Sequence, residues 1–498
     1  MSFSYQTYDA IGLAELVKAG EVSPRELVEA AFARMDEVNP VLNAVVRTRR
    51  EAALKEADEM PTGDSSRPFA GVPFLLKDIS QAIGGEPLTS GALLMKNHIA
   101  KRDSNFVARI RSGGFIPLGH TNTPEFGLKN ITESVLHGPA RNPWNTEFSP
   151  GGSSGGAAAA VASGIVPAAG ASDGGGSIRI PASFTGLFGL KPTRGRTPVG
   201  PGIGRQWQGA SIDFALSRSV RDSAAMLDLL QTLQPEAAFQ TPLYPGLYLD
   251  DLLKPVPKKL RIAYTTISPV GTPVSEEAAR AVLKTVKFLE AEGHEVEERL
   301  SPVNGVRLME NYYTMNAGEV AAMFVSLEGM LGRTISAGEV DVVTWVLGEA
   351  GKNVTAAEFI HSLHEWDVAA AQMSSLFKRY DLYVTPTNAD SAPKIGELSQ
   401  RPDEIEKLQQ VSNMSKDEQR RMIYTMFEPS LTYTPFTQLA NLTGQPAMSV
   451  PVHMTPSGLP VGVQVMSCKG REDLLLQVAA RLEESELWVG MKGNPLMP

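Results

Sequence analysis

Apolar residues recur at helical spacing from Leu27 to Val38, near the start of the chain. Directly before them, the segment SPRE at 23–26 supplies an N-cap serine, a proline at the first helical position and a glutamate that completes a capping box. Asn39-Pro40 predicts the end of this helix, because the residue before a proline disfavours helical dihedrals. Residues 1–68 are therefore predicted to form an N-terminal helical segment.

The pattern then changes several times along the chain. Residues 69–221 alternate short apolar runs with Gly, Ser and Pro, whereas LRIAYTT from Leu260, a helical stretch over 275–292 and a second strand-like run near Val296 indicate a βαβ unit. Residues 300–440 predict mostly helices, interrupted by the strand DLYVTPT from Asp381. The last sixty residues predict two strands, AMSVPV and LPVGVQVM, and a closing helix, REDLLLQVAARLEE.

This order of elements predicts an α/β protein. A length of 498 residues would allow about three domains, but no repeat, low-complexity linker or charge block marks a boundary. We therefore predict one large α/β domain over 1–498, with a core at 69–221, a variable substrate-shaping region at 222–440 and C-terminal strands and a helix at 441–498.

Composition removes several function classes. A single cysteine, Cys468, excludes intrachain disulfides and cysteine-rich metal modules. The net charge of −9 argues against a general nucleic-acid binder. The N-terminus shows no signal-peptide pattern, and the uncharged stretch 148–172 is too rich in Gly, Ala and Ser for a membrane helix. We expect a cytoplasmic protein without nucleic-acid or membrane partners, and a homodimer is one expectation for its assembly.

The segment GGSSGG at 151–156 satisfies the G-x-S-x-G pattern of a nucleophile elbow. An elbow needs a buried strand before the serine, and the preceding residues 142–150 contain two prolines and two asparagines, which indicate a loop. A Walker P-loop also fails, because Ala157 stands where that motif needs lysine. A tight turn into a helix remains open for this segment.

Three further glycines precede Ser177 in the segment DGGGS at 173–177. Consecutive N–H groups in such a turn form an anion-binding nest, which becomes an oxyanion hole beside a nucleophile. Lys77 follows the apolar run VPFLL, so that desolvation would lower its pKa and make it a candidate neutral base. The plainer alternatives are a mobile glycine loop and a lysine that reaches the surface or pairs with Asp78. Together, the sites supply nucleophile, base and oxyanion donors without histidine.

The run from Gly151 to Arg196 resembles the amidase signature, and GVPFLLKD, GHTNTPEFG, ARNPWN, DLYVTPT and GQPAMSVPV occur in that family's usual order. The resemblance to the amidase signature family implies an α/β/α sandwich around a large mixed sheet and a Ser–cisSer–Lys triad that needs no cofactor or metal. Carried over by motif, Ser177 is the nucleophile, Ser153 the bridging serine after a cis peptide bond, and Lys77 the base.

The same resemblance assigns residues around the triad. The family's oxyanion hole corresponds to the N–H groups of Gly174, Gly175, Gly176 and Ser177. The positions that brace the loop correspond to Ser154, Asp173 and Arg179. Within the family, the C-terminal stretch and the ARNPWN and SDGGGSIRIPAS motifs look most like bacterial amidases related to the 6-aminohexanoate cyclic-dimer hydrolases, which implies hydrolysis of a small amide, including cyclic or linear 6-aminohexanoate-type oligomers.

Substrate choice stays open at this point. A carbamate or ester hydrolase with the same triad, the A subunit of a glutamyl-tRNA(Gln) amidotransferase with two partner subunits, and an inactive anion-binding protein are alternatives. The insert from Asn311 to Trp366 offers wall residues for a substrate pocket, with ordinary helix packing as the plainer alternative: Tyr312, Tyr313, Asn316 and Trp345. His361 and His364 share a helical face, but a solvated face is the better interpretation than a metal site.

Overall fold

The computed structural model describes residues 4–61, 67–256 and 258–497. Its main feature is an 11-stranded sheet in the order β1-β3-β2-β6-β8-β7-β12-β13-β11-β9-β10, with β4 and β5 forming a separate pair. The strands are β1 (Val45–Thr48), β2 (Pro73–Lys77), β3 (Ile116–Thr121), β4 (Glu133–Ser134), β5 (Gly138–Pro139), β6 (Ala168–Asp173), β7 (Phe188–Lys191), β8 (Ile212–Ser217), β9 (Arg261–Tyr264), β10 (Glu295–Glu298), β11 (Leu382–Pro386), β12 (Ala447–Met454) and β13 (Pro460–Ser467).

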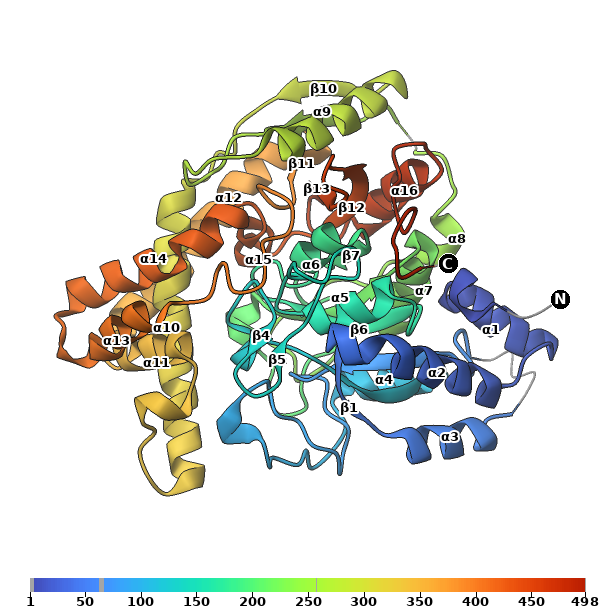
Figure 1. The fold of residues 1–498 in the computed structure, drawn as a ribbon. Helices are drawn as coiled ribbons and strands as arrows, with labels where there is room; N and C mark the ends of the chain where they lie inside the picture. The colour runs from blue at the N-terminus through green and yellow to red at the C-terminus, as the bar shows by residue number, and fades with distance from the viewer. Residues whose placement is uncertain (1–3, 62–66, 257, 498) are drawn as a thin grey trace.

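Helices flank this sheet (Figure 1). The α-helices are α1 (Ala10–Ala19), α2 (Pro24–Leu42), α3 (Arg50–Glu59), α4 (Asn105–Ser112), α5 (Gly155–Ala162), α6 (Arg179–Thr185), α7 (Val220–Leu230), α8 (Tyr248–Asp251), α9 (Glu276–Ala291), α10 (Gly305–Leu331), α11 (Val342–Gly351), α12 (Ala356–Phe377), α13 (Pro402–Leu408), α14 (Lys416–Tyr433), α15 (Gln438–Thr443) and α16 (Glu472–Glu483). The predicted α/β class, with a mixed central sheet between helices, is confirmed.

The sheet mixes parallel and antiparallel pairs. β2 pairs in parallel with β3 and β6, whereas β6 pairs antiparallel with β8. The βαβ unit predicted from residue 260 is present, since β9 and β10 are parallel neighbours joined through α9. The two predicted C-terminal strands, β12 and β13, form an antiparallel pair. Strands from both ends of the chain thus share one sheet.

The predicted end of the first long helix is wrong. The capping box at Ser23 is present, but α2 continues through Pro40 to Leu42 and ends at Asn43, which adopts a left-handed conformation with φ 48°. The N–H of Asn43 donates to the Asn39 carbonyl at 2.8 Å. Proline is tolerated here because it lies in the last turn, where it removes a single donor and the helix stops soon afterwards.

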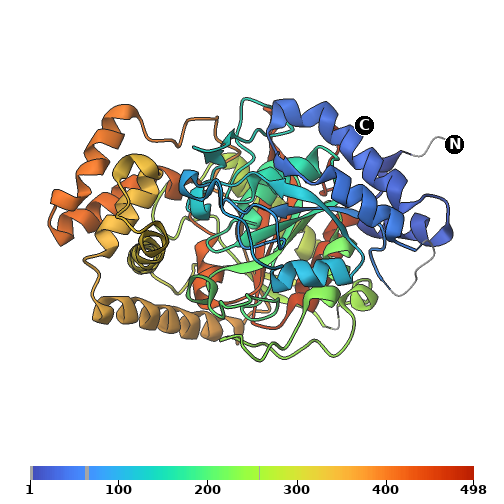
Figure 2. The ribbon, with the colours of Figure 1, turned by 90° about the horizontal axis from the view of Figure 1, so that it is seen from below.

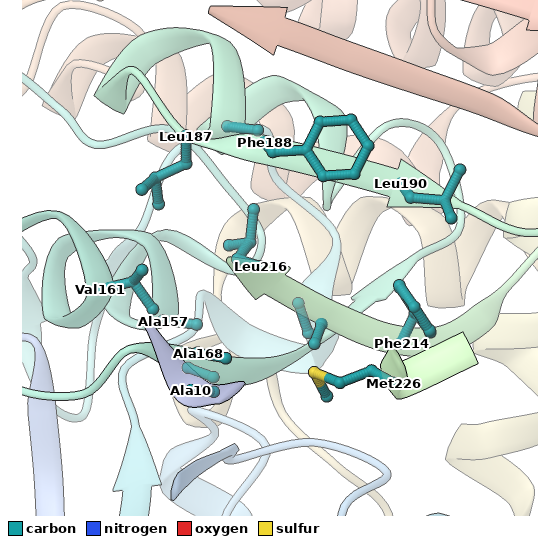
Figure 3. Packing of buried hydrophobic residues seen from close by; sticks show 14 of the residues in the cluster. Ala10, Ala157, Val161, Ala168, Leu187, Phe188, Leu190, Phe214, Leu216 and Met226 are labelled. Atoms are coloured by element: carbon teal, nitrogen blue, oxygen red, sulfur yellow. The ribbon is translucent and has the colours of Figure 1, made fainter. Parts of the chain in front are cut away.

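The glycine- and alanine-rich region forms part of the core rather than a surface loop. All eight residues of α5 are buried, and its Ala157 and Val161 lie beside Ala168 of β6 (Figure 3). Leu187, Phe188 and Leu216 extend this packing across the sheet. Small side chains let helix and sheet approach closely, and this buried layer fixes the loops at both ends of α5 and β6.

Helices from the predicted variable region extend the molecule to one side. Figures 1 and 2 both show α10, α11, α13 and α14 gathered away from the N- and C-terminal ends. A second hydrophobic cluster joins α10, α11, α14 and residues around Leu408, separate from the core over the sheet. Within the described residues, no helix combines the length and apolar character needed to cross a membrane.

Candidate active site

Lys77 ends β2, a strand whose five residues are all buried. Its side chain is 0% exposed, and Nζ donates to Ser153 Oγ at 2.7 Å and to Ser172 Oγ at 3.0 Å. Asp78 does not pair with this lysine, because successive strand residues face opposite sides. Its carboxylate accepts from Arg47 at 2.8 Å instead. The structure therefore contradicts the two plainer interpretations of Lys77, a surface lysine and an Asp78 partner.

Burial lowers the pKa of Lys77 from 10.5 to about 7, although the negative charges of Asp213 and Asp173 act in the opposite direction. A lysine with this pKa is substantially neutral at physiological pH and can accept a proton. Asp213 is itself buried on β8, opposite Ser172, and hydrogen bonds from Ser80 and Gln206 reach its carboxylate at 2.6 and 2.9 Å. Neither Asp213 nor Ser172 stands in a motif that identifies it as a site residue from the sequence.

The loop that carries Ser153 brings its hydroxyl to Lys77, beside the hydroxyl of Ser172. The Gly152–Ser153 peptide bond is cis, as the family resemblance implies. Thr123 Oγ1 donates to the Ser153 carbonyl at 2.9 Å, and Ser154 Oγ donates to the Ser172 carbonyl at 3.2 Å. These contacts tie the loop to its neighbours on both sides. The segment before Ser153 contains isolated bridges but no strand, consistent with the rejection of a nucleophile elbow.

The glycine loop leaves the carboxyl end of β6, the strand beside β2. Because the two strands are parallel, Lys77 and Asp173 end at the same edge of the sheet, the usual place for a ligand in an α/β fold. Ser177 follows at the start of the turn into α6 and is half-buried. Ser153, Ser172 and Ser177 all line one cavity with Gly174 and Gly175.

Asp173 organises this loop from inside. Its carboxylate accepts from the Gly176 N–H at 2.8 Å and from Arg179 Nε and Nη2, both at 2.9 Å. Of the four N–H groups expected to form an oxyanion hole, that of Gly176 therefore has a partner within the loop. In the described part of the chain, the N–H groups of Gly174, Gly175 and Ser177 make no hydrogen bond, so these three are free to donate to a ligand.

Arg179 completes a buried network behind the loop. Its guanidinium donates to the Thr437 carbonyl, to Gln464 Oε1 and to Asn441 Oδ1 at 2.8, 2.6 and 2.6 Å, in addition to Asp173. Burial alone would raise the pKa of Asp173, but the Arg179 charge and the hydrogen bonds from Arg179 and Asn441 outweigh burial and hold that pKa well below its ordinary range. The loop is thus braced by a permanently ionised pair.

A cavity of about 540 Å³, here called the site cavity, opens in front of these groups. Of the predicted wall residues, Tyr312, Tyr313 and Asn316 line it. Trp345 does not: it contacts Phe324 with ring centroids 6.4 Å apart and faces the Gln409 carbonyl, because the packing of α11 on α10 turns its side chain the other way. Most apolar wall residues lie outside the expected insert or were not singled out: Ile79, Phe126, Leu128, Trp207, Met309, Met323, Phe427 and Leu431.

The remaining candidates stand apart from this site. His361 lies 3.7 Å from Glu365 on an exposed face of α12, and in the described ranges no group of three His, Cys, Asp or Glu side chains is placed to hold a metal ion. Burial raises the pKa of Cys468, which disfavours its reactive thiolate. A larger cavity of about 880 Å³ lies between α10, α12 and α14 and is lined by charged side chains that include Arg307, Glu358 and Lys416.

Comparison with known proteins agrees with the motif assignment. The model of the Amidase family matches residues 26–476. The chain belongs to the amidase family. As an amidase, it is a hydrolase of carbon–nitrogen amide bonds, and the buried lysine, the two serines and the glycine loop lie within the matched region.

Several amidases are similar over the whole chain. Lipoamidase of Enterococcus faecalis is 41% identical over 97% of this amidase, which in turn covers 64% of the length of that lipoamidase. The 6-aminohexanoate-cyclic-dimer hydrolase of Paenarthrobacter ureafaciens is 37% identical, with 98% of this chain and 97% of the relative covered. A solved structure of 6-aminohexanoate cyclic dimer hydrolase with its substrate superimposes with a TM-score of 0.90 at 35% identity, covering 100% of both chains.

Proposed function

We propose that this amidase cleaves a small amide through the triad Ser177, Ser153 and Lys77, by way of an acyl-enzyme. The observation that carries the proposal is the 2.7 Å contact between Lys77 Nζ and Ser153 Oγ, made by a fully buried lysine whose pKa is lowered to about 7. A base and a bridging hydroxyl in contact, beside a serine with free N–H donors, is the arrangement that acyl transfer needs.

The reaction begins with a relay of protons. Neutral Lys77 takes the proton of Ser153 as Ser153 takes the proton of Ser177, and Ser177 Oγ attacks the amide carbonyl carbon. The carbonyl π electrons move to oxygen, and the N–H groups of Gly174, Gly175 and Ser177 hold the resulting oxyanion. Losing one such donor typically costs about 2.7–4 kcal/mol of transition-state stabilisation.

Collapse of the intermediate reverses the relay. The oxyanion re-forms the carbonyl, the carbon–nitrogen bond breaks, and the proton held by Lys77 passes through Ser153 to the departing nitrogen, which is too basic to leave as an anion. Water then attacks the acyl-enzyme with Lys77 again accepting a proton through Ser153. The products are a carboxylic acid and an amine, and the triad returns to its starting protonation state.

The cavity indicates the chemical class of the substrate. Its walls include the aromatic residues Phe126, Trp207 and Phe427. Its charged lining residues are Lys129, which is paired with Asp341 at 2.6 Å, Glu319, which accepts from Gln208 at 2.6 Å, and the exposed Arg205. We infer a largely apolar acyl group, consistent with the names of the similar lipoamidase and 6-aminohexanoate-cyclic-dimer hydrolase. The cytoplasmic location and the homodimer stay predictions.

A labelling experiment tests the triad. A fluorophosphonate should modify Ser177 in the purified protein, and Ser177→Ala should abolish both labelling and turnover. Ser375→Ala is a matched control, since Ser375 lies exposed on α12 and donates to the Ala371 carbonyl within its own helix. Near-normal turnover by Ser177→Ala would refute the assignment.

A substrate panel tests the reaction class. Aliphatic, aryl and cyclic amides should be hydrolysed faster than an aryl carbamate of the same acyl size, with products followed by mass spectrometry. Preference for the carbamate would favour the urethanase-like alternative. Glutaminase activity that appears only with partner subunits would favour the amidotransferase alternative.

A further inference from the structure

Three consecutive carbonyl oxygens of the glycine loop are each held by a side chain from a distant part of the chain. Asn441 Nδ2 donates to the Asp173 carbonyl at 2.9 Å, Tyr312 Oη to the Gly174 carbonyl at 3.0 Å, and Thr437 Oγ1 to the Gly175 carbonyl at 2.6 Å. In a planar trans peptide the carbonyl and the following N–H point in opposite directions. Each of these contacts therefore also fixes the direction of one N–H group.

The N–H groups fixed in this way differ in whether they are free to bind a ligand, as those of Gly176 and Gly175 show. The peptide held by Thr437 carries the Gly176 N–H, which donates to Asp173. The peptide held by Tyr312 carries the Gly175 N–H, which makes no hydrogen bond in the described part of the chain and belongs to a residue that lines the site cavity. Tyr312 thus controls a donor that is available to the substrate.

Tyr312 is built to remain in this position. Its hydroxyl approaches the loop so closely that a Cβ atom on Gly175 would lie 2.8 Å from it. Its ring packs near Trp366 and Tyr313, with centroids 6.5 and 6.1 Å away. One helical turn along α10, Asn316 accepts from Trp207 Nε1 at 2.6 Å and completes a polar face beside the loop.

The protonation state of the hydroxyl suits the same role. Burial raises the pKa of Tyr312 well above its ordinary value, and this effect outweighs the neighbouring Asn316 side chain, which acts in the other direction. The hydroxyl therefore keeps its proton throughout the working range of pH. It can serve the Gly174 carbonyl only as a donor, so that the contact does not switch off as the base titrates.

We propose that Tyr312 is a positioning residue for catalysis, whose hydroxyl fixes the Gly174–Gly175 peptide so that the Gly175 N–H is aimed at the oxyanion. The proposal rests on the proposed function, because the oxyanion exists only if Ser177 attacks a carbonyl. If so, α10 has two roles. It supplies a wall of the site cavity, and through Tyr312 it also holds the glycine loop in place.

Tyr312→Phe tests the proposal, because phenylalanine keeps the ring packing and removes only the hydroxyl. We expect kcat to fall by about tenfold to hundredfold, less than the loss of a whole oxyanion donor, with KM changed by less than about threefold. The affinity for a trifluoromethyl ketone that forms a tetrahedral adduct should fall in parallel with kcat. The affinity for a non-reacting ground-state analogue should stay unchanged.

Tyr248→Phe is the matched control. Tyr248 is also buried at a helix, its hydroxyl has no partner among the described residues, and it lies on α8 outside the site. Its removal should leave kcat unchanged. Circular dichroism and the melting temperature of both variants separate a folding defect from a catalytic one.

The outcomes are distinguishable. Wild-type kcat in Tyr312→Phe, or a rise in KM alone, would overturn the positioning role and leave Tyr312 as a simple wall residue. A fall in kcat without any loss of trifluoromethyl ketone affinity would overturn it as well. Turnover by Ser177→Ala would instead refute the proposed function itself.

Discussion

Lys77 Nζ lies 2.7 Å from Ser153 Oγ, although the two residues are 76 positions apart. The contact forms because β2 ends at Lys77 beside β6, and because the loop before α5 places Ser153 at the same edge of the sheet. Burial of the lysine then converts an ordinary cation into a group that can be neutral near pH 7. The position of Lys77, its burial and its lowered pKa thus all follow from the place of β2 beside β6 in the sheet.

The pH dependence of turnover should report this base. Because Lys77 must be neutral to accept a proton and its pKa is about 7, kcat/KM should rise with pH through about 7 and reach a plateau above it. Below the midpoint the loss should approach tenfold per pH unit. Lys77→Ala should be nearly inactive below pH 8. A wild-type profile that is flat from pH 5 to 9 would contradict the role of Lys77.

The same lysine should make stability depend on pH. Below pH 7 both the folded and the unfolded state carry its proton, and the folded state bears the full penalty of the buried charge. Between pH 7 and 10.5 only the unfolded state remains protonated, so the free energy of unfolding rises with pH, by an amount on the order of 5 kcal/mol in total. Denaturation of wild type and Lys77→Met from pH 6 to 10 should show a steeper rise in wild type, because buried Lys191, whose pKa is also lowered to about 7, contributes a rise to both proteins; parallel curves would contradict the role of Lys77.

Gly176→Ala should disrupt the loop. Gly176 has φ +127°, and an added Cβ would lie 2.2 Å from Thr437 Oγ1. The loop must therefore move, and we expect kcat to fall by at least about a hundredfold, as for the loss of an oxyanion donor. Gly329→Ala is the control: this glycine lies in α10 with open space around it, and alanine should stabilise the helix by about 0.5–1 kcal/mol without affecting kcat.

Arg179→Met should destabilise the protein strongly. Both Arg179 and Asp173 are fully buried, and removal of the guanidinium leaves the Asp173 charge without its partner. Such a loss typically costs about 3–5 kcal/mol, measurable as a lower urea midpoint. Arg25→Met removes an arginine from the exposed pairs with Glu29 and Asp58 and should leave the midpoint nearly unchanged. Equal effects of the two substitutions would show that the buried pair does not brace the fold.

Glu125 should make the free energy of unfolding fall as pH rises, which is the opposite of the effect of Lys77, and Glu125→Gln should remove this fall. Burial raises the pKa of Glu125 from 4.5 to about 7, even though the hydrogen bond from the Asp341 N–H at 2.7 Å favours its ionised form. Between these values the folded state retains a proton that the unfolded state loses, so its contribution to stability falls as pH rises and is fully lost above pH 7.

The melting temperature of Glu125→Gln relative to wild type should therefore increase between pH 5 and pH 8. Glu147→Gln, at an exposed position, is the control for the loss of one carboxylate. A constant difference for Glu125→Gln would mean that this carboxyl titrates normally in the folded protein.

Much of the architecture was predictable because it depends on local chemistry. The capping box at Ser23, the βαβ unit from residue 260 and the apolar run before Lys77 each determine an element from neighbouring residues alone. The candidate reacting groups were predictable for a related reason, since glycine runs and a lysine after a buried run are visible in the sequence without knowledge of the fold.

Long-range relationships were not predictable. Ser172 contacts Lys77 because β6 lies beside β2, and the Gly176 N–H faces Asp173 because the loop folds back on itself. The orientation of Trp345 depends on how α11 rotates against α10. The cavity wall supplied by Phe427 depends on α14 packing across α10, and neither rotation nor partner choice follows from helical spacing.

The side chains that hold the glycine loop have a consequence for the order in which the protein becomes an enzyme. Their contacts with the loop span 138 residues for Tyr312, 262 for Thr437 and 268 for Asn441. A nascent chain that has emerged as far as residue 180 already carries Lys77, Ser153 and Ser177 but none of these supports. Competence for hydrolysis should therefore arise late in synthesis, when most of the polypeptide has left the ribosome, so that the growing chain has no organised nucleophile to expose.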